Sequence, residues 1–165
     1  MRALLPLLLI VCLLAGCSQE KRQVTDLAKR CTEMSQSLDT AGRSYSAVLT
    51  PWLDGEKIDV SALEAALDKL APLPGQYLAE LEKIPVVEDD DVKAYRASMV
   101  SYLKVEEEMV KFLQATNKKV AASNPGPETL RTEVLNGLKQ VSKTEQAAIR
   151  EVNVRASDLT SALYR

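Results

Sequence analysis

The feature that most constrains this chain is an apolar seam that runs without interruption from residue 24 to residue 52. Its members recur at intervals that alternate between three and four, at Val24, Leu27, Cys31, Met34, Leu38, Ala41, Tyr45, Val48 and Trp52. This is the heptad spacing of a coiled coil, in which a helix buries one face against its neighbours. Nothing elsewhere in the chain reads as a strand, so the seam predicts an all-α fold.

Three more amphipathic segments follow, which gives predicted helices over residues 20–50, 60–84, 90–121 and 128–164. Turn-forming residues separate them, such as Asp54-Gly55 and the run Ser-Asn-Pro-Gly-Pro at 123–127. Asp59 is placed to cap the second helix. Short connections between long helices imply antiparallel neighbours, so we predict an antiparallel up-down four-helix bundle.

The second of these helices contains three residues that disturb helical structure, Pro72, Pro74 and Gly75. Each proline removes a backbone hydrogen bond and clashes with the preceding turn. We therefore predict a kink or a break at this point. The freed backbone groups make Pro72 and Pro74 candidates for contact with a partner.

The amino terminus has the pattern of a secretory signal peptide, with one basic residue and then a short apolar run from Leu4 to Ala15. The run is shorter than the roughly 20 apolar residues of a transmembrane helix. It ends in Leu14-Ala15-Gly16-Cys17, which resembles the lipobox of bacterial lipoproteins. The resemblance implies cleavage before Cys17, thioether lipidation of Cys17 and acylation of its new amine.

This resemblance divides the chain into three parts: a signal peptide at 1–16, a lipidated tether at 17–22 and one bundle domain at 23–165. Several acyl chains on one cysteine anchor a protein stably to a membrane. In Gram-negative lipoproteins, Asp after the lipidated cysteine tends to retain the protein in the inner membrane, whereas this chain has Ser18. We therefore expect the periplasmic face of the outer membrane.

The chain contains no histidine, which removes the usual general base, the common catalytic triads and the imidazole ligands of metal sites. Glycine-rich nucleotide loops are absent from the sequence as well. Its 21 basic and 23 acidic residues are interspersed, which argues against nucleic acid as a partner. We expect no enzymatic activity and no cofactor.

Two carboxylates fall on apolar stripes, Glu106 on the third helix and Glu145 on the fourth. In an antiparallel hairpin they would lie at similar heights, where they could bind a metal or share a proton. The alternative, which we favour, places both at the stripe's edge in solvent or paired with Lys104, Lys143 or Arg155. The metal sites of helical bundles use Glu-x-x-His, which this chain cannot supply.

The remaining candidates are a thiol, an acidic run and several aromatic side chains. Cys31 lies on the seam, so we expect a buried and inert thiol. The acidic residues at 88–91 suit the first turn of a helix. Trp52 is the best candidate for an exposed partner anchor. Four tyrosines lie on apolar stripes, either as plain core or as the lining of a ligand pocket: Tyr45, Tyr77, Tyr95 and Tyr102.

The sequence thus favours a non-enzymatic outer-membrane lipoprotein that binds an envelope protein or helps to assemble an envelope complex. The long surfaces of a helical bundle suit the recognition of a partner helix. The alternative is a carrier or sensor of a small hydrophobic ligand, bound between the helices near the tyrosines.

Overall fold

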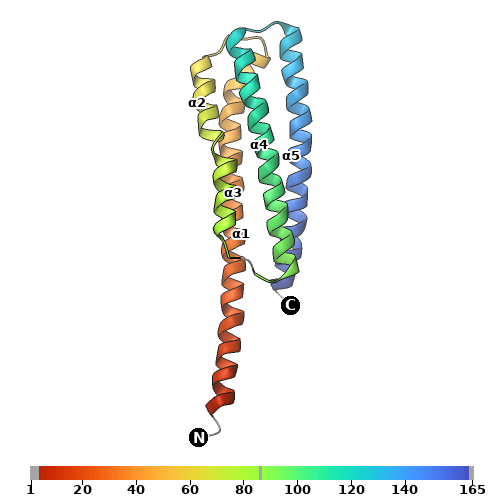
Figure 1. The fold of residues 1–165 in the computed structure, drawn as a ribbon. Helices are drawn as coiled ribbons and strands as arrows, with labels where there is room; N and C mark the ends of the chain where they lie inside the picture. The colour runs from red at the N-terminus through yellow and green to blue at the C-terminus, as the bar shows by residue number, and fades with distance from the viewer. Residues whose placement is uncertain (1–3, 86, 164–165) are drawn as a thin grey trace.

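The computed structural model describes residues 4–85 and 87–163, and side chains from residue 19 to residue 160 except residue 86. The described residues form helices and no strands, and the helices pack side by side as a bundle (Figure 1). The all-α four-helix bundle predicted from the sequence is confirmed, with α2 and α3 together forming its second member. The helices are α1 (Leu4–Leu53), α2 (Val60–Leu70), α3 (Leu73–Lys83), α4 (Asp90–Ala122) and α5 (Glu128–Leu163).

The predicted disturbance in the second helix lies between α2 and α3. Ala71 and Pro72 keep helical backbone angles, and Ala71 N still donates to Leu67 O at 2.8 Å, so the chain bends without unwinding. Pro74 lies in the first turn of α3, where a missing N–H costs no helical bond. Pro72 is exposed, but Pro74 is buried and therefore unavailable to a partner.

Helix α1 is longer than the predicted helix over 20–50, because it runs as one element from Leu4 to Leu53. Residues 19–22, which were predicted to belong to a tether, lie within it. The side chains of residues 1–18, including that of Cys17, lie outside the described part of the structure. Among the described residues, no helix is both long enough and apolar enough to cross a membrane.

The hydrophobic core follows the predicted seam of α1 and runs from Val24 to Leu159. Towards the end of α1 the buried position shifts by one residue, from Val48 to Leu49. Cys31 is 1% exposed, and burial raises the pKa of its thiol to about 11, so it is a core side chain as predicted. Because the core begins at Val24, a chain that starts at Ser18 retains every described core residue.

Trp52 is fully buried, which corrects the prediction that it is an exposed anchor. Its indole Nε1 donates to Ser123 O at 3.0 Å, so the loop between α4 and α5 covers it. A Cβ on Gly126 would lie 2.6 Å from the indole ring, and only glycine lets the loop approach so closely. The sequence pattern could not reveal this cover, because it comes from a loop about 70 residues away.

Further hydrogen bonds tie the same end of the bundle together. The side chain of Asn124 accepts from Ile58 N at 3.0 Å and donates to Ile58 O at 2.7 Å, which joins the two loops. Arg131 of α5 donates to Leu53 O at 2.9 Å, which ties α5 to the last residue of α1. These contacts fix the spacing of α1 and α5 at this end.

The opposite end is held by capping interactions. Arg96 of α4 donates to Leu81 O and Ile84 O, which satisfies carbonyls at the end of α3. Asp89 caps α4 by accepting from Val92 N at 3.0 Å. The acidic run at 88–91 therefore has the capping role that the sequence predicted for it.

Candidate functional site

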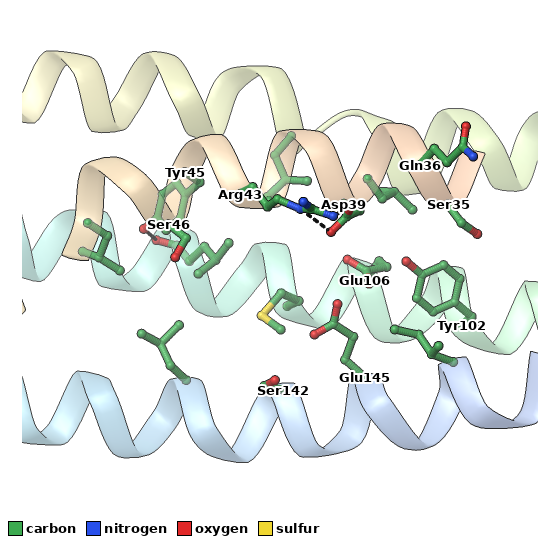
Figure 2. A pocket seen from close by; sticks show the side chains of 18 of the residues that line it. Ser35, Gln36, Asp39, Arg43, Tyr45, Ser46, Tyr102, Glu106, Ser142 and Glu145 are labelled. Atoms are coloured by element: carbon green, nitrogen blue, oxygen red, sulfur yellow. Dashed lines mark hydrogen bonds and ion pairs between the residues drawn. The ribbon is translucent and has the colours of Figure 1, made fainter. Parts of the chain in front are cut away.

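Helix α5 is the least buried member of the bundle. Of its described side chains only Val134 and Leu159 are buried, and the three exposed large apolar residues of the described chain, Leu135, Ile149 and Val154, all belong to it. Between α5 and α1 lies an open groove of about 650 Å³, with α4 as its floor (Figure 2).

The groove exists because α1 turns a stripe of small and polar residues towards it. These residues are spaced by four, three and four positions, which places them on one side of α1: Ser35, Asp39, Gly42 and Ser46. A Cβ added to Gly42 would meet no atom within 4 Å. With no large apolar side chain on this stripe, the space between α1 and α5 stays unfilled.

The two ends of the groove differ in polarity. Near the loops it is lined by leucines from all three helices: Leu49, Leu53, Leu113 and Leu138. Further along α1, the carboxyl groups of Asp39, Glu106 and Glu145 approach from three different helices (Figure 2). The groove therefore has an apolar section that leads to an acidic section.

Glu106 is the chemically unusual member of this acidic section. Its side chain is 5% exposed, and its Oε1 atom is buried with no hydrogen-bond partner. The pKa of Glu106 is raised to about 7, first by burial and then by the negative charge of Glu145 and a hydrogen bond with it, while hydrogen bonding with Tyr102 lowers it. The position of Glu106 on the core stripe of α4 is what removes the carboxyl group from water.

Glu145 faces Glu106 from α5 and is half-buried. Burial is the main cause that raises its pKa, a hydrogen bond with Glu106 lowers it, and the charge of Asp39 raises it. The prediction that the two glutamates lie at similar heights is confirmed. The favoured prediction of a solvent-exposed pair is wrong for Glu106, because this residue belongs to the buried stripe of α4.

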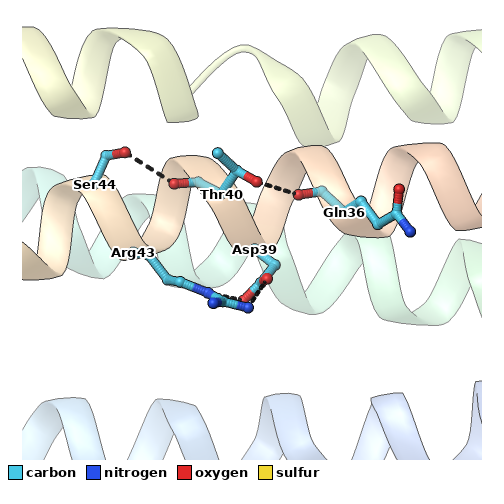
Figure 3. Close-up of polar contacts among 5 residues, drawn as sticks. All are labelled: Gln36, Asp39, Thr40, Arg43 and Ser44. Carbon is cyan, nitrogen blue, oxygen red and sulfur yellow. Dashed lines mark hydrogen bonds and ion pairs between the residues drawn. The ribbon is translucent and has the colours of Figure 1, made fainter.

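No basic side chain compensates the two glutamates among the described residues. Arg43 donates from Nε to Asp39 Oδ1 at 2.9 Å and is held by a second bond to the same carboxylate (Figure 3). Arg155 pairs with other carboxylates, those of Glu151 and Asp158. The described ion pairs therefore leave Glu106 and Glu145 without a countercharge.

The serine and threonine hydroxyls of α1 whose hydrogen bonds are described do not compensate them either, because each bonds to its own helix. Ser35 donates to Cys31 O at 3.0 Å, and Thr50 donates to Ser46 O at 2.8 Å. Figure 3 shows the same arrangement for two neighbouring hydroxyls of α1. Such bonds to the carbonyl four residues earlier are common for Ser and Thr in helices.

The structure separates the four candidate tyrosines into two pairs. Tyr45 and Tyr102 line the groove, whereas Tyr77 and Tyr95 do not. The hydroxyl of Tyr45 donates to Asn117 Oδ1 at 2.6 Å, so it is already satisfied.

Among the described residues, no cluster of three or more His, Cys, Asp or Glu side chains could hold a metal ion.

Sequence reasoning missed most of the lining that α1 contributes, including Asp39, Gly42, Arg43 and Ser46. The available signal was the regular spacing of small and polar residues beside the apolar seam. In a four-helix bundle each helix has two neighbours, so this second face of α1 would also lie next to a helix.

Comparisons with known proteins do not place the chain in a family. No protein-family model matches. No curated protein and no solved structure matches it either. The functional argument therefore rests on the groove.

We predict that Glu106→Gln makes the folded protein more stable above neutral pH. The pKa of Glu106 is raised from 4.5 to about 7, so the unfolded chain ionises first and stability is lost as pH rises between these values. The variant avoids this loss, and we expect a gain of up to about 3 kcal/mol near pH 8 and a much smaller gain near pH 5. Urea denaturation across this pH range measures it.

The control is Glu108→Gln, which removes an exposed carboxylate from the same helix. Its unfolding free energy should follow that of the parent at every pH. If Glu106→Gln also runs parallel to the parent, then Glu106 is not an ionisable group held away from water.

Proposed function

We propose that this chain is a non-enzymatic, lipid-anchored protein of the bacterial envelope that holds an elongated hydrophobic ligand in the groove between α1 and α5. The observation that carries the proposal is the groove itself. Its volume of about 650 Å³ falls within the roughly 300–1,000 Å³ of small-molecule sites. The surface of its lining is largely apolar, and its charged side chains lie at one place.

The size of the groove favours a small molecule over a partner helix. Along α1 the lining extends from Ser35 to Leu53, which is about 27 Å at 1.5 Å per residue. A helix about 10 Å wide and of that length would occupy about 2,000 Å³, so only one face of it could lie within the groove. The groove offers about 650 Å³, which suits a single extended apolar chain.

The non-enzymatic part of the proposal rests on the absence of partners for the carboxyl groups. Glu106 and Glu145 are accompanied by neither a histidine nor, among the described residues, a metal-ligand cluster. Binding needs only the shape and polarity of the groove.

The proposed location rests on the amino-terminal sequence. Residues 1–16 would direct export, and Cys17 would carry the lipid that holds the protein on the periplasmic face of the outer membrane. Ser18 favours this membrane over the inner one.

We predict that Cys17→Ser abolishes lipidation and membrane retention. Without the thiol no thioether to a diacylglyceryl group can form, so radioactive palmitate added to growing cells should label the parent and not the variant. Cell fractionation gives the second readout, in which the variant leaves the membrane pellet. Equal labelling of both proteins would contradict lipidation at Cys17.

We predict that the chain purified from residue 18 onwards retains an apolar adduct that Gly42→Leu excludes. The leucine would occupy the groove, since a Cβ at this position meets nothing within 4 Å. Replacement of a helical glycine also favours folding by about 1 kcal/mol, so loss of the adduct could not be attributed to unfolding. Native mass spectrometry reports the adduct and circular dichroism the fold.

The matched control is Ala47→Leu, which adds the same side chain to an exposed position of α1 outside the groove. This variant should keep the adduct. If the parent carries no adduct and takes up no added long-chain alcohol, the groove is not a ligand site.

A second candidate function is the binding or assembly of an envelope protein complex. The observation that favours it is the exposed apolar surface of α5, where Leu135 is 40% exposed and Val154 is 52% exposed. Exposed Pro72 at the bend between α2 and α3 remains a candidate contact, whereas buried Trp52 and Pro74 do not.

A photo-crosslinking amino acid in place of Val154 tests this candidate in living cells. One envelope protein captured from position 154, and not from the exposed polar position Glu64 of α2, would support an assembly role. The same background pattern from both positions would argue against it.

A further inference from the structure

The acidic section of the groove contains two carboxyl groups that no described ion pair compensates. Glu106 Oε1 is buried without a hydrogen-bond partner, and Glu145 faces it from the opposite helix. A buried polar atom without a partner costs free energy, and a buried charge without a countercharge costs more. A bound group that supplies both hydrogen bonds and positive charge would remove this cost.

The protein does not supply that group itself. Arg43, the basic residue in the groove lining, is held by both oxygens of Asp39. The remaining charge of the lining is that of Glu106 and Glu145, so the acidic section is negative overall when both are ionised. An anionic ligand would be repelled there, and a neutral one would leave the charge uncompensated.

We propose that the groove binds an amphiphile that carries a primary ammonium group on a single apolar chain. The ammonium lies between Glu106 and Glu145, and the chain extends along the leucines towards the loops. This assignment rests on the proposed function and specifies the chemical class of its ligand. An ammonium offers three donors and forms strong charge-assisted hydrogen bonds with carboxylates.

The order of polarity along the groove gives the direction of the bound molecule. Leu113 of α4 lies seven residues beyond Glu106, and Leu138 of α5 lies seven residues before Glu145. Seven residues are two helical turns, or about 10 Å. The apolar section therefore begins within reach of an alkyl chain whose head group lies between the carboxylates.

Decylamine, decanoate and decanol test the assignment, because they share one chain and differ in the charge of the head group. The protein is the chain from Ser18 onwards, which contains the whole described core and whose fold is checked by circular dichroism. Isothermal titration calorimetry near pH 8, with each probe below its micelle concentration or its solubility limit, measures the affinity. We expect decylamine to bind at least about tenfold more tightly than decanoate, as charge-assisted hydrogen bonds imply.

Two variants identify the carboxylate responsible. Glu106→Gln should weaken decylamine binding by about tenfold or more and leave decanol binding unchanged, which shows that the groove is intact. Glu108→Gln, the exposed control on α4, should bind decylamine as the parent does.

A fall in decylamine affinity from pH 8 to pH 5.5 is a further readout. The groups that face Glu106 are Asp39 and Arg43 of α1, Tyr102 of α4 and Glu145 of α5, while α2 contributes only Leu70 to the lining. The pKa of Asp39 is lowered by Arg43, that of Arg43 is raised by Asp39, and burial raises that of Tyr102. Protonation of Glu106, whose pKa is raised to about 7, therefore removes negative charge from the site over this range.

The outcomes separate the inference from the function on which it rests. Decanoate or decanol binding as tightly as decylamine would overturn the amine assignment and leave a hydrophobic ligand site in place. An unchanged decylamine affinity in Glu106→Gln would also overturn it. Failure of all three probes to bind would overturn the proposed function itself.

Discussion

The hydrogen bonds at the loop end of the bundle determine how far apart α1 and α5 can lie. Arg131 joins α5 to the last residue of α1, and Asn124 joins the two loops that precede α2 and α5. These bonds hold both helices at a fixed distance at the loop end, where leucines of α1 and α5 line the groove. Further along, the small residues of α1 cannot fill the same distance, so the groove opens. The groove is therefore a consequence of this fixed end and of a stripe of small and polar side chains on α1.

The carboxyl group of Glu106 shows how binding and stability oppose each other in this bundle. A leucine in its place would complete the core of α4, because the residue lies on the same stripe as Leu103 and Val110. The chain instead places an ionisable group there and loses stability when the group is charged and unpaired. A bound group of opposite charge would recover this lost stability, because it would compensate the buried carboxylate.

The sequence was sufficient for the fold because each helix carries its own pattern. The seam of α1, the cap at Asp59 and the turn residues between helices are local signals, and local signals define helices well. The groove depends on the rotation and spacing of several helices relative to one another, and the sequence pattern of one helix does not contain this information. Tyr45 and Tyr95 look alike as members of apolar stripes, yet only Tyr45 reaches the groove. The exposure predicted for Trp52 is wrong because a loop distant in the sequence covers its side chain.

The unbroken course of α1 has a mechanical consequence for a protein anchored at its amino terminus. From residue 19 to Ser35, where the groove lining begins, the helix advances about 24 Å. A straight helix transmits orientation as well as distance, since it resists bending far more than an unstructured linker does. With a lipid at Cys17, the helix would hold the groove at a fixed distance from the bilayer. The long axis of the groove would keep a constant angle to the amino-terminal part of α1.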